Sequence, residues 1–255
     1  MNMNVSTILA AIVALLTGLA AGNYMGEQPT PSQNETNANE YEKAEYTPAA
    51  EDYVSLRPTL DSLPTELLTD EERAGLLLMR EEEKLARDVY QTLYEKWGLQ
   101  IFANIAQSEQ THTEAVRDLL NKYDVTDPVT DDTVGVFTDQ NLADLYRSLV
   151  AAGTQSETDA LTVGATIEDL DISDLARLLT QTDNEDITLV YENLLRGSRN
   201  HLRAFTRQLT AQDATYTAQY ISSTELETIT STNQERGSTA GRTGSGGRGW
   251  GGGKR

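Results

Sequence analysis

The chain has 255 residues, enough for one sizeable domain with tails, and it has no cysteine, which excludes disulfides, thiolate metal sites and a cysteine nucleophile. Its 40 acidic and 20 basic residues give a formal net charge of −20, which argues against nucleic acid as a partner because phosphate binding requires a basic surface. The whole chain holds two histidines, so any imidazole chemistry is confined to His112 and His201.

The N-terminus carries an apolar run from Val5 to Gly22 that ends in small residues, as a cleavable signal peptide does. The run is also long enough for an uncleaved membrane anchor, because roughly 17–25 apolar residues can span a bilayer. We expect residues 1–22 to be one or the other. Both alternatives predict an exported protein, extracellular or held at the cell surface.

Two further stretches have the composition of flexible chain. Residues 23–63 are polar, acidic and proline-containing and keep no apolar period, which predicts a disordered linker. At the other end, residues 213–255 finish in a glycine-rich basic sequence, GSTAGRTGSGGRGWGGGKR, which cannot bury a core. We predict a flexible C-terminal region there.

Between these tails, residues 64–212 carry the apolar period of long helices. Thr69 and Glu72 form a capping box at the start of the first helix, and Gly98 ends it. A second helix is predicted from about Ile101 to Tyr123.

A long connection separates this helix pair from a second one. Residues 124–138 contain proline and several aspartates, and residues 141–152 predict a short helix ended by Gly153. Two more long helices are predicted at about 158–181 and 185–212. Two tightly joined pairs linked by one long crossover have ferritin-like connectivity. The predicted fold class is therefore all-α: a ferritin-like four-helix bundle with one long crossover, flanked by disordered tails.

Carboxylate and imidazole side chains fall on the inward stripes of all four long helices. A bundle buries these stripes, so ionisable residues on them are informative. Glu109 and His112 lie three residues apart within an apolar stripe, a spacing that brings both side chains to one face of the helix. The candidate metal ligands on the four stripes are Glu83, Glu109, His112, Glu168, Asp171 and His201.

This set of side chains matches the charge of two divalent metal ions. Four carboxylates and two neutral imidazoles would balance the metals, whereas without metal the carboxylates would repel one another in a low-dielectric core. Oxygen and nitrogen donors of this kind suit iron or manganese, although copper and zinc bind the same groups. The alternative is that these residues are surface charges and two core histidines with ordinary hydrogen bonds.

Four segments resemble rubrerythrin, a member of the ferritin-like superfamily. EKLARDVY (83–90) is similar to its first-helix pattern, and FANIAQSEQTH (102–112) to its second-helix Glu-x-x-His pattern. GATIEDLD (164–171) resembles its third-helix acidic pair, and LLRGSRNHLRAF (194–205) its fourth-helix histidine segment. The stretch 63–209 also resembles an uncharacterised ferritin-like family of exported prokaryotic proteins, known only as a domain of unknown function.

The resemblance implies that the six candidate residues are ligands of a di-iron centre, with Asp171 in the place of a glutamate. Ser198 stands where the fourth helix normally carries a glutamate, so the resemblance implies one missing carboxylate and a more open site. The absence of cysteine also means that rubrerythrin's rubredoxin-like domain is missing, and turnover would need an external reductant.

Three functions fit these observations. The first is a di-iron oxidoreductase of peroxidase or ferroxidase type, in which ferrous iron reduces peroxide or oxygen. The second is a non-catalytic exported module that sequesters or senses iron or manganese. The third is a helical surface protein with a vestigial site. No catalytic residue is assigned, and a homo-oligomer is left open.

Overall fold

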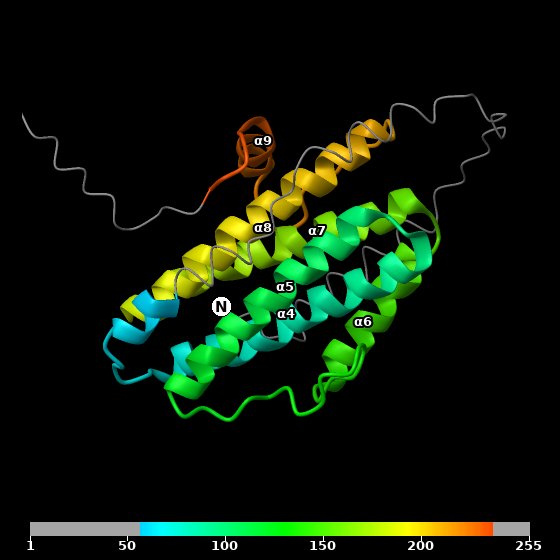
Figure 1. The fold of residues 1–255 in the computed structure, drawn as a ribbon. Coiled ribbons are helices and arrows are strands. Elements are labelled where there is room, and N and C mark those ends of the chain that lie inside the picture. The colour runs from blue at the N-terminus through cyan, green and yellow to red at the C-terminus, as the bar shows by residue number, and fades with distance from the viewer. Residues whose placement is uncertain (1–56, 237–255) are drawn as a thin grey trace, which may run out of the picture.

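A computed structural model describes residues 57–236, and every regular element within that range is an α-helix (Figure 1). The predicted signal or anchor segment, most of the predicted linker and the glycine-rich tail lie outside the described residues. Between residues 57 and 236, no helix is both long and apolar enough to cross a membrane.

The first two long helices form an antiparallel pair. Helix α4, Asp70–Trp97, begins with the predicted capping box: the Glu72 N–H donates to Thr69 Oγ1 at 3.1 Å, and the Thr69 N–H donates to Glu72 Oε2 at 2.8 Å. The helix ends at Gly98, whose φ of 69° is a left-handed conformation that glycine adopts without steric cost. Helix α5, Gln100–Lys122, follows at once and packs along α4.

The second half holds a short helix and another long pair. Helix α6 spans Gln140–Gly153, α7 spans Glu157–Leu179 and α8 spans Glu185–Ala211. Helices α7 and α8 pack along each other, while α4 also contacts α7 and α5 contacts α8. The four long helices therefore lie side by side around a common core, and α6 packs against α4 and α7 (Figure 1). For residues 57–236, the prediction of an all-α fold is confirmed.

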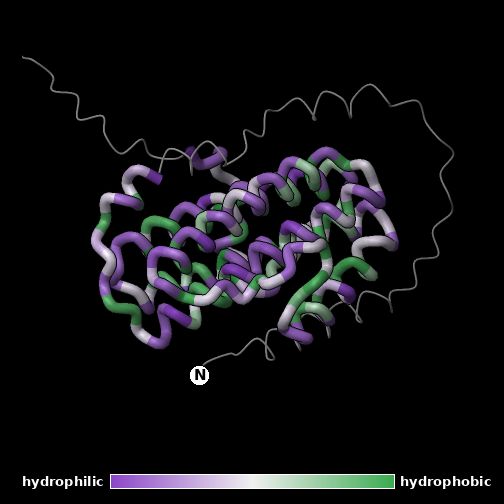
Figure 2. Tube along the Cα trace, turned by 60° about the horizontal axis from the view of Figure 1, so that its bottom comes forward, coloured by the Kyte–Doolittle hydropathy of each residue, from purple (hydrophilic) through white to green (hydrophobic). Residues whose placement is uncertain are grey.

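Hydrophobic and hydrophilic residues alternate along the helices (Figure 2), and the buried apolar residues gather into two separate core clusters. One cluster includes Leu76, Val116 and Leu194, and the other includes Val89 and Phe205. Each buried side chain of this kind contributes roughly 1.5–3 kcal/mol to folding. Along α4, α5 and α8, the charged residues predicted as ligands lie between residues of one cluster and residues of the other, and form a charged layer there.

Part of the predicted linker is helical. Residues 57–62 form a short helix in which Leu60 is buried against the first of these clusters. Lys122 at the end of α5 holds this segment, because its Nζ donates to the carbonyl oxygens of Leu60 and Leu63 at 3.1 and 3.0 Å. The helix depends on these long-range contacts, which the local sequence does not encode.

The structure also differs from the predicted flexible region 213–255, because the chain packs against α7 after α8 ends. Asp169, fully buried on α7, accepts a hydrogen bond from the Tyr216 hydroxyl at 2.7 Å. The backbone N–H groups of Gln219, Tyr220 and Ile221 donate to the same carboxylate at 2.5, 3.2 and 2.9 Å. A single buried aspartate thus orders a polar segment that has no apolar period of its own.

Helix α9, Ser223–Ser231, then lies on α8 (Figure 1). Arg203 of α8 donates to the carbonyl oxygen of Ile229 at 2.6 Å and to the carboxylate of Glu235 at 2.7 Å. The described chain is therefore held on the bundle almost to residue 236.

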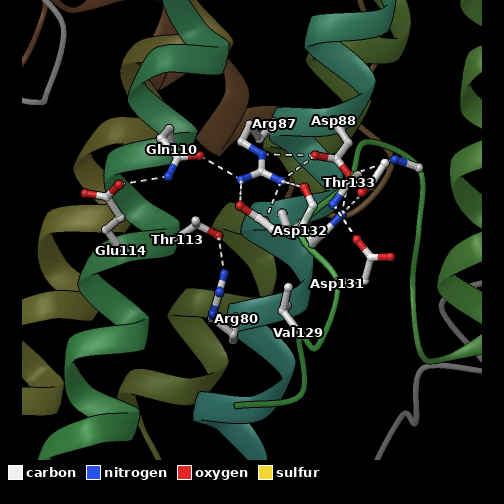
Figure 3. Close-up of polar contacts among 12 residues, drawn as sticks. Arg80, Arg87, Asp88, Gln110, Thr113, Glu114, Val129, Asp131, Asp132 and Thr133 are labelled. Carbon is white, nitrogen blue, oxygen red and sulfur yellow. Dashed lines mark hydrogen bonds and ion pairs between the residues drawn. The ribbon is translucent and has the colours of Figure 1, made fainter.

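The crossover between α5 and α6 is fixed to α4 by three buried cations, Arg80, Lys84 and Arg87, each 3% exposed or less. Arg80 donates to Asp127 of the crossover at 3.1 Å. Arg87 donates to Asp132 of the same connection at 2.8 Å (Figure 3). We call these three side chains the cationic stripe of α4.

Asp88 joins the cationic stripe to the crossover. Its carboxylate accepts hydrogen bonds from Lys84 Nζ at 2.5 Å and from Arg87 Nε at 2.9 Å. It also accepts from the N–H of Gly135 at 2.9 Å, while Lys84 donates to the carbonyl oxygen of Thr133 at 3.0 Å. Because each cation of the stripe has a carboxylate partner, the long connection is a fixed part of the fold.

Candidate metal centre

Five of the six predicted ligands meet in the charged layer between the core clusters. Their ligand atoms form two groups, within each of which all atoms lie within 4.8 Å of one another. All five side chains are 2% exposed or less. The groups are Glu83 with Glu109 and His112, and Glu109 with Glu168 and His201. Glu109 belongs to both.

Glu109 lies between the two imidazoles. Its Oε2 is 2.7 Å from His112 Nδ1, and its Oε1 is 2.7 Å from His201 Nδ1. Each Nδ1 also faces a second carboxylate, since His112 Nδ1 is 3.2 Å from Glu83 Oε2 and His201 Nδ1 is 3.3 Å from Glu168 Oε2. The arrangement is nearly symmetric, with one histidine and one glutamate on each side of a shared carboxylate.

Neighbouring side chains orient the second group. The Tyr90 hydroxyl donates to Glu168 Oε1 at 2.6 Å, and the tyrosine ring packs against Phe102 and Phe205. Ser108 Oγ lies 3.1 Å from His201 Nε2, so the other ring nitrogen, Nδ1, is directed at the carboxylates. The sequence gives little indication of Ser108, which is one of many serines and lies outside the stripe.

Gly197 on α8 makes room for the His112 ring. A Cβ added at this glycine would lie 2.5 Å from His112 Cε1 and 2.7 Å from Nε2, well inside van der Waals contact. The absence of a side chain here allows α8 to approach α5 closely enough for both histidines to face Glu109.

Gly197→Ala is therefore expected to displace the His112 ring and to weaken metal binding by its group about 10–100-fold, the usual effect of disturbing a ligand's support. Titration of the purified variant with Co²⁺ measures this affinity. Gly75→Ala is the matched control, because its Cβ would meet the ends of the Leu178 and Tyr191 side chains, at 2.8 and 3.1 Å, and no histidine. Equal affinities for both variants and wild type would contradict the role assigned to Gly197.

Burial and mutual charge set the protonation of the metal-free centre. Burial lowers the pKa of His112, but Glu109 and Glu83 outweigh this and raise it to about 10. Glu109 and Glu168 likewise raise the pKa of His201 to about 10 against the effect of burial. Burial raises the pKa of Glu83 to about 8, despite the opposing effect of His112.

The pKa of Glu109 is shifted in the opposite direction, below its usual value. Burial alone would raise its pKa, but the charges of His201 and His112 hold it well below the usual range of a glutamate. Without metal, the centre therefore balances an ionised Glu109 with protons on its two histidines. Glu109 therefore faces a histidine charge on each side, and two bound cations would supply charge of the same sign at these places.

The donor set fits two divalent transition metals. Glu83 Oε1 is buried and has no hydrogen-bond partner, a state that ordinarily costs about 1–3 kcal/mol and calls for an explanation. Each group offers one imidazole nitrogen and carboxylate oxygens, donors that iron, manganese and zinc accept.

Asp171, the sixth predicted ligand, lies outside both groups. It is one turn beyond Glu168 on α7, and burial, followed by the charges of Glu83 and Glu168, raises its pKa well above the usual range. Ser198 Oγ donates to the carbonyl oxygen of Leu194 at 3.2 Å. Helix α8 therefore brings a histidine to the centre and no carboxylate.

Glu82 is a buried acid that the apolar period did not single out. The structure directs its neighbour Glu83 to the histidines, as predicted, while Glu82 lines a small hollow with Asp171 between α4, α6 and α7. Burial, and then the charges of Asp174 and Glu83, raise the pKa of Glu82 well above the usual range.

Comparison with known proteins gives a family and relatives. Residues 72–233, which include both groups, match the family described as "Uncharacterized protein domain (DUF2202)". The chain is 59% identical to "Uncharacterized protein MJ0754" of Methanocaldococcus jannaschii over 178 residues, 70% of this chain and 96% of that protein. The crystal structure of hypothetical protein MJ0754 from Methanococcus jannaschii is similar, with a TM-score of 0.67 at 59% identity, covering 68% of this chain and 99% of that one.

Proposed function

The chain belongs to the DUF2202 family, and we propose that it is a ferritin-like di-metal carboxylate protein that binds two iron ions and reduces peroxide or dioxygen. Manganese is the alternative metal. The observation that carries the proposal is the pair of buried ligand groups joined by Glu109. Two antiparallel helix pairs joined by one long crossover support the ferritin-like assignment.

One metal would be held by Glu83, Glu109 and His112, and the other by Glu109, Glu168 and His201. The Nδ1 atoms are the histidine donors in this assignment, because they face the carboxylates. Three side chains for each ion leave coordination positions open for a substrate, as in catalytic rather than structural sites. This open coordination favours chemistry over storage.

Bound ferrous iron would supply the electrons: two Fe²⁺ become two Fe³⁺ while one hydrogen peroxide takes two electrons and two protons and leaves as two water molecules. The protein's part is to keep the five ligand side chains out of bulk water and to fix Glu168 through the Tyr90 hydroxyl. Since the chain has no cysteine to hold an electron-transfer cluster, an external reductant is needed for repeated turnover.

A sequestration module is the second candidate, and the closure of the site favours it. Every ligand side chain is 2% exposed or less, so a bound ion would leave slowly. Export remains a prediction for either function, because the apolar run at residues 5–22 lies outside the described residues.

The test is anaerobic loading of the purified wild-type protein with Fe²⁺, followed by hydrogen peroxide. The proposal predicts two bound iron ions per chain and the oxidation of both by one equivalent of peroxide, followed by optical absorption. Iron that stays bound but consumes neither peroxide nor oxygen would favour sequestration. A chain that binds no metal would be a helical protein with a vestigial site.

Metal loading is expected to release protons and to strengthen as pH rises. At pH 7 the metal-free protein holds protons on His112, His201 and Glu83, whose pKa values of about 10, 10 and 8 all lie above that pH. Burial also raises the pKa of the fourth ligand group, Glu168. Metal binding requires the deprotonated groups, so loading both ions should release about three protons or more at pH 7. Calorimetry in buffers of different ionisation enthalpy counts them; a release near zero would contradict the assigned ligands.

The same shifts set the pH dependence of the metal-free fold. A histidine pKa raised in the folded state stabilises the protein fully below the unfolded value of about 6.5. This contribution is lost as pH rises through about 10, and both His112 and His201 follow this rule. The thermal midpoint of the metal-free protein should therefore fall between pH 7 and pH 10.

A further inference from the structure

A line of carboxylates leads from the metal centre towards the surface along α7. Glu168, Asp171 and Asp174 follow one another at three-residue spacing, and each step advances ~4.5 Å and turns about 60° around the helix. Consecutive members are neighbours, while the line turns away from the core. Their exposure rises from 0% to 2% and 5%, and Arg177, three residues further on, has a side chain 39% exposed.

Glu82 of α4 faces this line across the helix interface. Helices α4 and α7 are in contact, and Glu82 and Asp171 together line the small hollow that α6 covers. The remaining walls of the hollow are largely apolar and include Leu145 and Leu149 of α6. The two carboxylates are therefore the polar part of its wall. One of them, Glu82, directly precedes the predicted ligand Glu83 in the chain.

Glu82 and the two outer acids of the line, Asp171 and Asp174, each have a buried oxygen without a hydrogen-bond partner. Glu82 Oε2, Asp171 Oδ2 and Asp174 Oδ2 accept no hydrogen bond. Arg177 binds only the other oxygen of Asp174, Oδ1, at 2.6 Å. Unpaired carboxylate oxygens at neighbouring buried positions are unfavourable, and a cation bound between them would give each of them a partner.

The opposite side of α4 is closed to cations. There the cationic stripe of Arg80, Lys84 and Arg87 is buried beneath the crossover, and its positive charge would repel a divalent ion. The line of acids is the side of the centre that offers oxygen ligands to a divalent ion.

We propose that Glu82, Asp171 and Asp174 form an admission site, at which a divalent cation binds briefly before it moves to the centre. This inference rests on the proposed function. Within the described residues, the compact acidic and histidine groups are the two that share Glu109, and the three admission residues are not among them. Their looser spacing suits transfer from one carboxylate to the next, whereas the compact groups suit retention.

The experiment follows Co²⁺ uptake by the metal-free protein in a stopped-flow spectrometer, through the visible absorption of Co²⁺ ligated by histidine. Glu82→Gln and Asp174→Asn are each expected to slow uptake about tenfold, because an amide is a poorer ligand for a divalent cation than a carboxyl group; tenfold is also the lower end of what electrostatic attraction contributes to association rates. The final content should remain two Co²⁺ per chain. Glu81→Gln, the same change at the adjacent residue, which faces the crossover, should stay within about twofold of wild type.

Uptake at the wild-type rate by both neutralised variants overturns the inference and leaves the proposed function standing. A final content below two ions also overturns it, because the residues would then be retaining ligands. Wild type that takes up no Co²⁺ overturns the proposed function as well. If a variant fails to fold, crystals of wild type in excess Co²⁺ decide. Anomalous scattering should then show a weak third site at Glu82, Asp171 and Asp174, and its absence overturns the inference.

Discussion

Glu109→Gln is expected to remove both metal ions from each chain, lowering the affinity of each group by more than about 100-fold, beyond the 10–100-fold typical of changes to a ligand's support. Glu109 is the one residue common to both groups, with an oxygen 2.7 Å from the Nδ1 of each histidine. A neutral amide loses the charge that attracts both cations. Elemental analysis of the purified, metal-loaded variant measures the loss.

Two further variants test whether the loss of both ions is specific to Glu109. His201→Ala removes a ligand from one group alone and should leave one ion per chain, bound by Glu83, Glu109 and His112. Glu114→Gln, on the same helix and partly exposed, should retain two ions. If Glu109→Gln kept two ions, Glu109 would not be shared and the two-metal assignment would be wrong.

Asp88→Asn is expected to destabilise the fold by about 3–5 kcal/mol, the cost of leaving a buried charge without its partner. Asp88 is fully buried and accepts hydrogen bonds from Lys84, Arg87 and the Gly135 N–H. An asparagine would leave two buried cations beside a neutral amide and loosen the crossover. Thermal unfolding of the metal-free protein should show a midpoint lower by on the order of 10 °C.

Asp132→Asn is the matched control, since Asp132 pairs with the same Arg87 at 2.8 Å but its side chain is 60% exposed. Water screens this pair, and its loss should cost less than about 1 kcal/mol. Similar losses of stability in the two variants would show that buried charge at Asp88 is not what holds the crossover.

The sequence predicts those parts of the fold that depend on local interactions. Thr69, Glu72 and Gly98 bound α4 because caps act within a few residues of the helix end. The chain after residue 212 could not be predicted in the same way. Its order depends on Asp169, some fifty residues earlier, whose carboxylate collects donors from a segment without apolar period.

The cluster of five buried side chains was predictable for a related reason, and the same physics limits how much of it the sequence gives. Inward stripes and the two histidines identify the five side chains that meet, because a helical period indicates which face is buried. The period does not separate Glu82 from Glu83 where α4 is covered on several sides, and both are buried. The period also does not show whether a side chain lies close enough to the others to share a metal ion. Asp171, one turn beyond Glu168, was predicted as a ligand but lies outside the compact groups.

The most direct test of the central claim is anomalous X-ray scattering at the iron edge, from crystals of wild-type protein loaded with Fe²⁺. Two peaks per chain are predicted, one on each side of the Glu109 carboxylate, the first beside His112 and the second beside His201. No peak within the bundle, or iron at surface carboxylates alone, would contradict the account.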